Sequence, residues 1–183
     1  MPHRDATHHQ HILDVAIAIM KSDFASMQVY DANRHALHLL TYRGFIPSAV
    51  DAWTWIFPHS GTGCAISLTT GRRTIVPDIE LCETLKHEAF RECGIRAMQT
   101  TPLRVAGRLV GMVSTHWRTI HQPKPSQLRL FDIWAQQTAD LMVKNEDVAK
   151  VVKEAATQIE RNKQLTQEFE QLMLRHLPMM GTG

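Results

Sequence analysis

The stretch "CGIRAMQTTPLRVAGRLVGMVSTHW" (residues 93–117) decides the fold, because it predicts two strands joined by a tight turn. Residues 95–103 and 109–117 are rich in apolar and β-branched side chains, and "RVAGR" around Gly107 supplies the turn between them. We therefore expect an antiparallel hairpin.

The second of these strands is apolar where it begins and ends in "STHW" (114–117). Successive side chains of a strand point to opposite faces, so Met112, Ser114 and His116 share one face. Val113 and Thr115 share the other. A strand that ends in this way either runs out into solvent or lines a polar pocket, and the choice decides whether the protein only packs or also binds.

The remaining sequence surrounds this hairpin with helices and further strands. The expected elements are a helix at 10–21, strands at 23–31 and 36–44, a loop with short helical pieces at 45–72, a strand at 73–79 and a helix at 80–93. Antiparallel strands with helices on both sides define an α+β layer fold.

A long helix is predicted after residue 126, because residues 127–176 contain neither glycine nor proline. Its length of roughly 75 Å would exceed the width of a compact domain. Its apolar residues recur in steps of three and four, as in a parallel two-stranded coiled coil. The seam positions are Asn145, Val148, Val152, Ala155, Ile159, Asn162, Leu165 or Thr166, Phe169, and Leu172 or Met173.

We accordingly expect a homodimer held by a projecting coiled coil at 144–177, with a tail at 178–183. The alternative is a helix that folds back on its own domain, which the lack of any turn disfavours. Residues 1–9 are polar and rich in histidine, and we expect them to be disordered.

The composition is that of an ordinary globular protein, with 183 residues, 44% apolar, 21% charged and a net charge of +2. Scattered basic residues give no reason to expect nucleic acid or a membrane surface. Cys64, Cys82 and Cys93 form no CxxC pair, which favours free thiols in a cytoplasmic protein and no zinc site. The apolar run at 12–20 is too short to cross a bilayer.

Five stretches resemble a GAF domain over residues 10–143. They are "DFASMQVYD" (23–31), "ALHLLTYRGF" (36–45), "TGCAISLTTGRRTIVPDIE" (62–80), the hairpin at 93–117, and "LRLFDIWAQQTADLM" (128–142). The last two closely resemble GAF modules of bacterial sensor histidine kinases and related signalling proteins. The resemblance implies terminal helices on one sheet face, a ligand pocket on the other, and small-molecule sensing relayed through a dimeric helix bundle to a kinase or another output domain.

By this resemblance one face of the hairpin and the residues above it enclose the pocket. The pocket candidates are Trp53, Trp55, Cys64, Phe90, Cys93, Arg96, Met98, Thr100, Met112, Ser114 and His116. Aromatic rings offer stacking area, and Arg96 could pair with an anion. A planar or cyclic ligand with one negative group would fit, but the sequence does not name a ligand or cofactor.

Other GAF families suggest alternatives that we test on particular residues. Free methionine sulfoxide reductases have a cysteine where Cys64 stands, but their substrate-holding acids would fall at Met98, Ser114 and His116, none of which is acidic. Bilin-binding members attach the chromophore at a Cys-His pair, which aligns here with Leu85 and Lys86, so no covalent bilin is expected. The "NKxDE" signature of members that bind cyclic nucleotides is missing.

Two further alternatives do not depend on a bound ligand. A structural dimerisation module would have its cavity filled by its own side chains, such as Met98, Met112 and the tryptophans. A redox sensor would use a cysteine thiolate, for example Cys93 beside a cation. The sequence contains no phosphate loop, nucleophile elbow or metal-binding helix motif, so we expect a non-catalytic sensor without catalytic or metal-binding residues.

Overall fold

The computed structural model describes residues 3–86 and 88–176. The chain divides into two compact units, residues 1–142 and 143–183. The first unit contains the sheet, and the second contains residues 143–176 of the long helix. Within the described part of the chain, no helix combines the length and apolar content that a membrane span requires.

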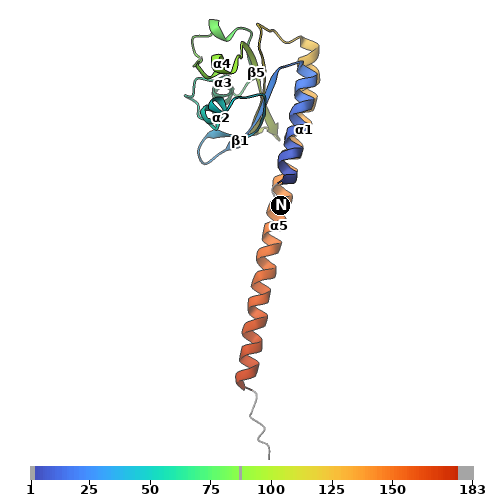
Figure 1. Cartoon of the computed structure of the whole chain (residues 1–183). Helices are drawn as coiled ribbons and strands as arrows, with labels where there is room; N and C mark the ends of the chain where they lie inside the picture. The colour runs from blue at the N-terminus through green and yellow to red at the C-terminus, as the bar shows by residue number, and fades with distance from the viewer. Residues whose placement is uncertain (1–2, 87, 177–183) are drawn as a thin grey trace, which may run out of the picture. The chain divides into compact units, whose positions relative to one another are not determined.

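The first unit is built on a six-stranded antiparallel sheet (Figure 1). The strands are β1 (Phe24–Asp31), β2 (Ala36–Arg43), β3 (Trp55–Ile56), β4 (Thr74–Val76), β5 (Ala97–Val105) and β6 (Arg108–Trp117), in the order β3-β2-β1-β6-β5-β4. The predicted hairpin is β5–β6, and Val105 pairs with Arg108 across its turn. Ala106 and Gly107 both have positive φ, as a two-residue type I′ turn requires.

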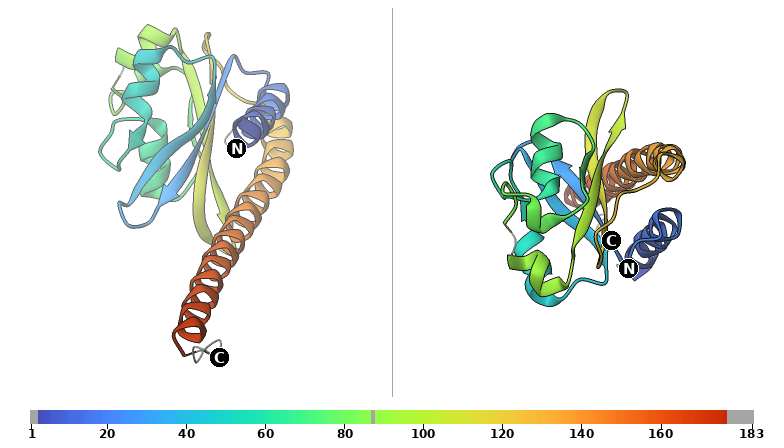
Figure 2. Two further views of the ribbon diagram at one scale, coloured as in Figure 1. Left: turned by 60° about the horizontal axis from the view of Figure 1, so that its bottom comes forward. Right: turned by 90° about the horizontal axis from the view of Figure 1, so that it is seen from above.

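Helices cover both faces of the sheet, as Figure 2 shows end-on. The helices are α1 (His3–Met20), α2 (Pro47–Trp53), α3 (Gly63–Thr70), η1 (Ile79–Leu81), α4 (Glu88–Cys93) and α5 (Pro125–His176). On one face α1 and residues 125–142 of α5 pack against the sheet, and on the other lie α2, α3 and α4. This is the α+β layer fold that the sequence predicts.

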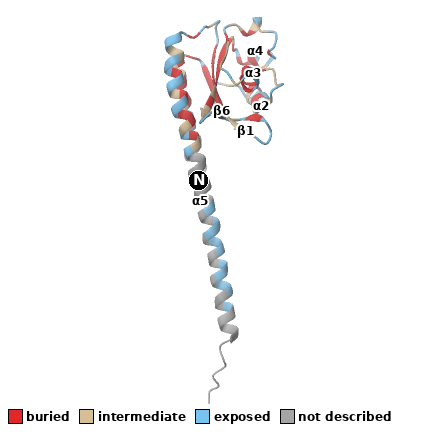
Figure 3. Cartoon of the chain, turned by 180° about the vertical axis from the view of Figure 1, so that it is seen from behind, coloured by how far each residue is buried: buried red, intermediate tan, exposed pale blue. Residues whose placement is uncertain are grey.

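Each face of the sheet has its own hydrophobic core, and Figure 3 shows buried residues on the sheet and on the helices that face it. Leu13 of α1 and Phe131 of α5 are fully buried in the core beneath the terminal helices. Val113 of β6 lies in this core, whereas Met112 lies in the other. The period-two prediction for this strand is therefore confirmed.

Glycine is required where β1 and β6 approach most closely. Val29 pairs with Gly111, and a Cβ on Gly111 would collide with the carbonyl oxygen of Gln28. Because that obstacle is backbone, no side-chain rotation relieves it. Gly111 thus fixes the spacing of the two central strands.

Two predicted segments differ from the structure. Helix α1 begins at His3 rather than Gln10, so residues 3–9 are helical where disorder was expected; no glycine or proline interrupts 3–20. The helix predicted at 80–93 forms only in part: among the described residues, η1 and α4 lie at its two ends, and residues 82–86 are not helical. The Lys86 N–H donates to the Gly61 carbonyl at 2.8 Å, so this tertiary contact takes the place of a helical hydrogen bond at Lys86.

The predicted long helix forms without a break from Pro125 to His176. The homodimer and the projecting coiled coil stay predictions. Among the seam positions, the following side chains lie outside the described residues: Asn145, Val148, Val152, Ala155, Ile159, Asn162, Thr166, Phe169, Leu172 and Met173.

Candidate functional site

A small cavity lies between the sheet and the layer formed by α2, α3 and α4. Its lining comes from Ser26, Gln28, Phe45, Trp53, Ile56, Thr62, Cys64, Phe90, Met98 and His116. The space open to the centre of a water molecule is about 10 Å³. One buried water needs roughly 10–15 Å³ by the same measure. The protein's own side chains therefore fill most of this site.

Aromatic rings form one side of the cavity. The Trp53 ring packs at 4.9 Å from both Phe45 and Phe90, measured between ring centroids. Phe45 meets the His116 imidazole edge-on at 5.3 Å, and Trp53 lies parallel to that imidazole at 6.3 Å. Edge-to-face and offset arrangements at these distances are favourable, so the rings form one packed cluster around the imidazole.

Polar side chains form the opposite side, around Cys64. This residue lies in the first turn of α3, whose preceding residue Thr62 accepts a hydrogen bond from the Ala65 N–H at 3.2 Å. The Cys64 Sγ lies 3.1 Å from the Ser114 hydroxyl, which is 2.8 Å from that of Thr100. Strands β5 and β6 thus supply hydroxyl partners that satisfy the buried thiol.

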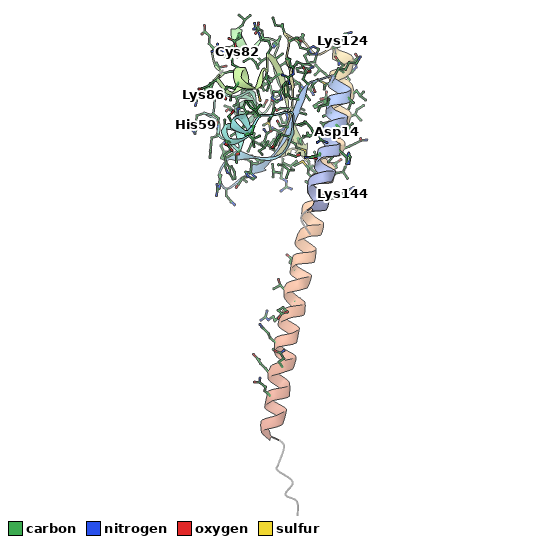
Figure 4. The ribbon with its side chains drawn as sticks, viewed as in Figure 1. Asp14, His59, Cys82, Lys86, Lys124 and Lys144 are labelled. Atoms are coloured by element: carbon green, nitrogen blue, oxygen red, sulfur yellow. The ribbon has the colours of Figure 1, made fainter. Side chains whose placement is uncertain are left out.

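Burial raises the pKa of the Cys64 thiol, and its hydrogen bonds with Ser114, Thr100 and Gln28 offset only part of that rise. A protonated thiol is a poor nucleophile. Cys93 is buried, and Cys82 is half-buried on the outer side of this layer, away from α1 (Figure 4). Cys64 therefore behaves here as a small buried residue with a hydrogen-bonding sulfur.

His116 is a buried imidazole with an unsatisfied nitrogen. Its side chain is 3% exposed, and burial lowers its pKa from 6.5 to about 3. The ring is therefore neutral at physiological pH. Among the described residues its Nδ1 has no hydrogen-bond partner. A buried polar atom in this state typically costs about 1–3 kcal/mol, which a hydrogen bond from a ligand would recover.

The structure brings together many of the predicted pocket residues. Five line the cavity: Trp53, Cys64, Phe90, Met98 and His116. Thr100 and Ser114 lie behind Cys64 and hold its sulfur. Met112 and Cys93 belong to the same hydrophobic core without lining the cavity.

Trp55 and Arg96 do not line this cavity. The Trp55 ring packs at a tilt against His38, with 4.4 Å between ring centroids, and the Arg34 guanidinium lies 4.5 Å above its ring. Arg96 precedes β5 and donates two hydrogen bonds to Asp78, at 2.6 and 2.9 Å. The expected partner for an anionic ligand is thus already paired outside the cavity.

Sequence analysis missed five lining residues: Ser26, Gln28, Phe45, Ile56 and Thr62. The alternation of residues 23–31 carried the signal for the first two, because Ser26 pairs directly with Ser114 and Gln28 with Met112. The other three come from the segment 45–72, whose path no sequence pattern indicated.

The described residues hold no group of three or more histidine, cysteine, aspartate or glutamate side chains that could bind a metal ion. The site offers neutral rings, hydroxyls, one thiol and one imidazole. It can stack a flat molecule and exchange hydrogen bonds with it.

A layered antiparallel sheet, with terminal helices on one face and shorter helices over a small cavity on the other, defines the class of this α+β domain. The family model of the GAF domain matches residues 9–143, and this chain belongs to the GAF family. GAF domains are usually regulatory or sensory modules. No curated protein matches the sequence.

Solved structures agree with this fold. A domain of a protein named as a two-component sensor histidine kinase, from Sinorhizobium meliloti 1021, is 20% identical with a TM-score of 0.62, and the match covers 75% of this chain and 90% of that one. The GAF domain of an Acinetobacter phosphoenolpyruvate-protein phosphotransferase is 11% identical, with a TM-score of 0.64 and coverages of 76% and 82%.

A type II free methionine-R-sulfoxide reductase from Thermoplasma acidophilum is similar to the same degree. It is 14% identical with a TM-score of 0.62, and the match covers 75% of this chain and 91% of that one. At such identities the likeness establishes the fold alone. Whether this chain senses or catalyses has to be argued from its own residues.

Proposed function

We propose that this GAF domain is a non-catalytic sensor of a small molecule, and that it works as a homodimer. A ligand binds between the sheet and the α2–α4 layer, and α1 and α5 carry its effect to an output domain or partner. The observation that carries the proposal is the unsatisfied Nδ1 of His116 in a buried aromatic and polar site.

Strand β6 supports the relay, because its alternate residues belong to the two sides of the sheet. His116 lines the cavity, while Trp117 packs in the core beneath the terminal helices. The indole Nε1–H of Trp117 donates to the Lys21 carbonyl, directly after α1, at 3.1 Å. A change at the cavity thus reaches the end of α1 through adjacent residues.

Exposed apolar side chains on the outer side of the terminal helices support the homodimer. They are Val15 of α1 and Leu130, Ile133 and Leu141 of α5. At 100° per residue, the three α5 positions fall within roughly 80° of one another, so they form one stripe. The heptad pattern predicted for 144–177 is a second and separate reason to expect a dimer.

The chemistry of Cys64 supports a non-catalytic domain. A sulfoxide reductase needs a reactive thiolate and carboxylates for the substrate ammonium group. Here burial raises the thiol pKa, and Met98, Ser114 and His116 stand where acids would be needed.

A second candidate is a structural dimerisation module, which the cavity volume of about 10 Å³ favours. Under this alternative the side chains of Trp53, Phe90 and Met98 fill the site permanently. The two candidates differ in whether a small molecule stabilises the folded chain.

A thermal-shift panel separates them. Nucleotides, haem, bilins and aromatic acids are each added to the full chain at fixed protein concentration. A ligand present at about 100 times its dissociation constant adds about 2.7 kcal/mol to the free energy of unfolding. A stabilising hit supports sensing, and no shift across the panel leaves the structural module.

Light scattering tests the homodimer with a matched pair of variants. Ile133→Lys places a charge on the exposed stripe of α5, and Ile120→Lys makes the same change at an exposed isoleucine outside α1 and α5. We expect wild type and Ile120→Lys to be dimers and Ile133→Lys to be a monomer. A monomeric wild type, or equal dissociation in both variants, contradicts the proposed dimer surface.

A further inference from the structure

We infer that the ligand of this cavity is a small, flat, uncharged molecule that forms a hydrogen bond with Nδ1 of His116 and takes the place of the Met98 side chain. This inference rests on the proposed sensing function. It departs from the sequence expectation of a ligand with a negative group.

The lining offers no countercharge. At neutral pH none of its ten residues carries a formal charge, because His116 is neutral and the others are apolar or hydroxyl, amide and thiol groups. Arg96 is paired with Asp78 and Arg91 with Glu80, and the Arg118 guanidinium lies 4.5 Å over the ring of Phe24, which does not line the cavity. A charged ligand would lose its hydration and gain no ion pair, so the site selects against both signs of charge.

The position of His116 determines where a polar group of the ligand would form its hydrogen bond. The other polar lining around Cys64 is already connected, through Ser114 and Thr100. The imidazole Nδ1 has no partner and lies beside Trp53 and Phe45. A flat ligand that stacks on these rings brings its own donor or acceptor to that nitrogen.

Space for the ligand can come from Met98. Its thioether occupies the room that Gly63 leaves by lacking a side chain: the sulfur lies 2.8 Å from where a Cβ on Gly63 would stand. Methionine is unbranched with three rotatable bonds, so it can leave this position more easily than the packed rings of Trp53 and Phe90. A change of its rotamer enlarges the cavity without moving the sheet.

Three probes of nearly equal shape test the charge preference: benzamide is neutral, benzoate is an anion and benzamidine is a cation. Their affinities for the full chain at pH 7.5 are measured by protein-observed NMR, for wild type and for Met98→Ala. We expect benzamide to bind roughly tenfold or more tightly than either charged probe. Met98→Ala should strengthen benzamide binding.

The role of the nitrogen is tested by a matched pair of variants. His116→Phe keeps a ring and removes the nitrogen. His121→Phe makes the same change at a half-buried histidine, whose buried Nε2 also has no partner among the described residues but which stacks on Trp117 outside the cavity. We expect about a tenfold loss of benzamide affinity in the first and none in the second.

A third measurement covers the case in which His116→Phe does not fold. In Met98→Ala, bound benzamide should shift the ¹⁵N resonance of the His116 Nδ1. Tighter binding of a charged probe, or benzamide binding that leaves His116 unaffected, overturns the ligand class and leaves sensing in place. If none of the three probes binds to wild type or to Met98→Ala, the inference is overturned. The thermal-shift panel then decides whether the domain senses a small molecule at all.

Discussion

The buried imidazole of His116 predicts an acid-dependent loss of stability that one substitution should remove. The folded protein holds this ring with a pKa of about 3, against 6.5 for an ordinary histidine, and burial is the cause. Below pH 6.5 the unfolded chain therefore binds a proton that the folded chain does not bind until about pH 3. The contribution of His116 to stability is present above pH 6.5 and is lost progressively as the pH falls from 6.5 toward 3.

The size of the effect follows from the two pKa values. Each pH unit between them changes the free energy of unfolding by about 1.36 kcal/mol. At pH 7.5 the unfolded chain hardly protonates His116, so the loss of stability from this proton is close to zero. At pH 5.0, about 1.5 pH units below the ordinary pKa, protonation of His116 in the unfolded chain should lower the free energy of unfolding of wild type by about 2 kcal/mol relative to a variant without this imidazole. His116→Phe is a suitable variant, because the ring already lies among Phe45 and Trp53.

Urea unfolding at pH 7.5 and 5.0, for both proteins at one protomer concentration, measures the difference. All other groups that titrate in this range are shared, so their contributions cancel in the comparison. We expect the wild-type free energy of unfolding to fall by about 2 kcal/mol more than that of His116→Phe. Equal losses in the two proteins would refute the reasoning, because they would mean that the folded state protonates His116 as readily as the unfolded chain.

Two further predictions concern the sheet and the thiols. Gly111→Ala should lower the free energy of unfolding by about 1–3 kcal/mol in urea titrations, because its Cβ meets the carbonyl oxygen of Gln28; wild-type stability would show that the strands can separate freely. Thiol labelling of the native protein, followed by mass spectrometry, should modify the half-buried Cys82 first and leave the buried Cys64 and Cys93 until unfolding. Rapid labelling of Cys64 would contradict its enclosure.

The central hairpin could be predicted from sequence because both faces of its strands are buried. Each face has its own core, so a one-residue error in register would exchange the two sets of side chains. That constraint makes the alternation in β6 reliable, from Met112 to Trp117. The same alternation in β1, read together with its pairing to β6, contained the missed lining residues Ser26 and Gln28.

Period two gave the wrong result for Arg96 because the strand begins one residue later. By parity Arg96 shares a face with Met98, but its backbone carbonyl accepts from the Ile79 N–H and its guanidinium is held by Asp78. Likewise, helical spacing at 80–93 did not outweigh the contact between Lys86 and Gly61. In both cases a tertiary partner far along the chain decided the conformation, and local periodicity contains no information about such a partner.

The proposed relay has a short path, because hydrogen bonds join the last residues of β6 to the residues that follow α1. The His116 carbonyl accepts a hydrogen bond from the Asp23 N–H at 2.9 Å, and the Arg118 N–H donates to the Asp23 carboxylate at 2.8 Å. Together with the bond from Trp117 to Lys21, these contacts fix the α1–β1 junction to the last residues of β6. A ligand that moves His116 therefore acts directly on residues 21–23, which join α1 to β1. Such a contact transmits a signal only if the helix pair has two arrangements of similar energy, which is why the proposed function requires the dimer as well as the cavity.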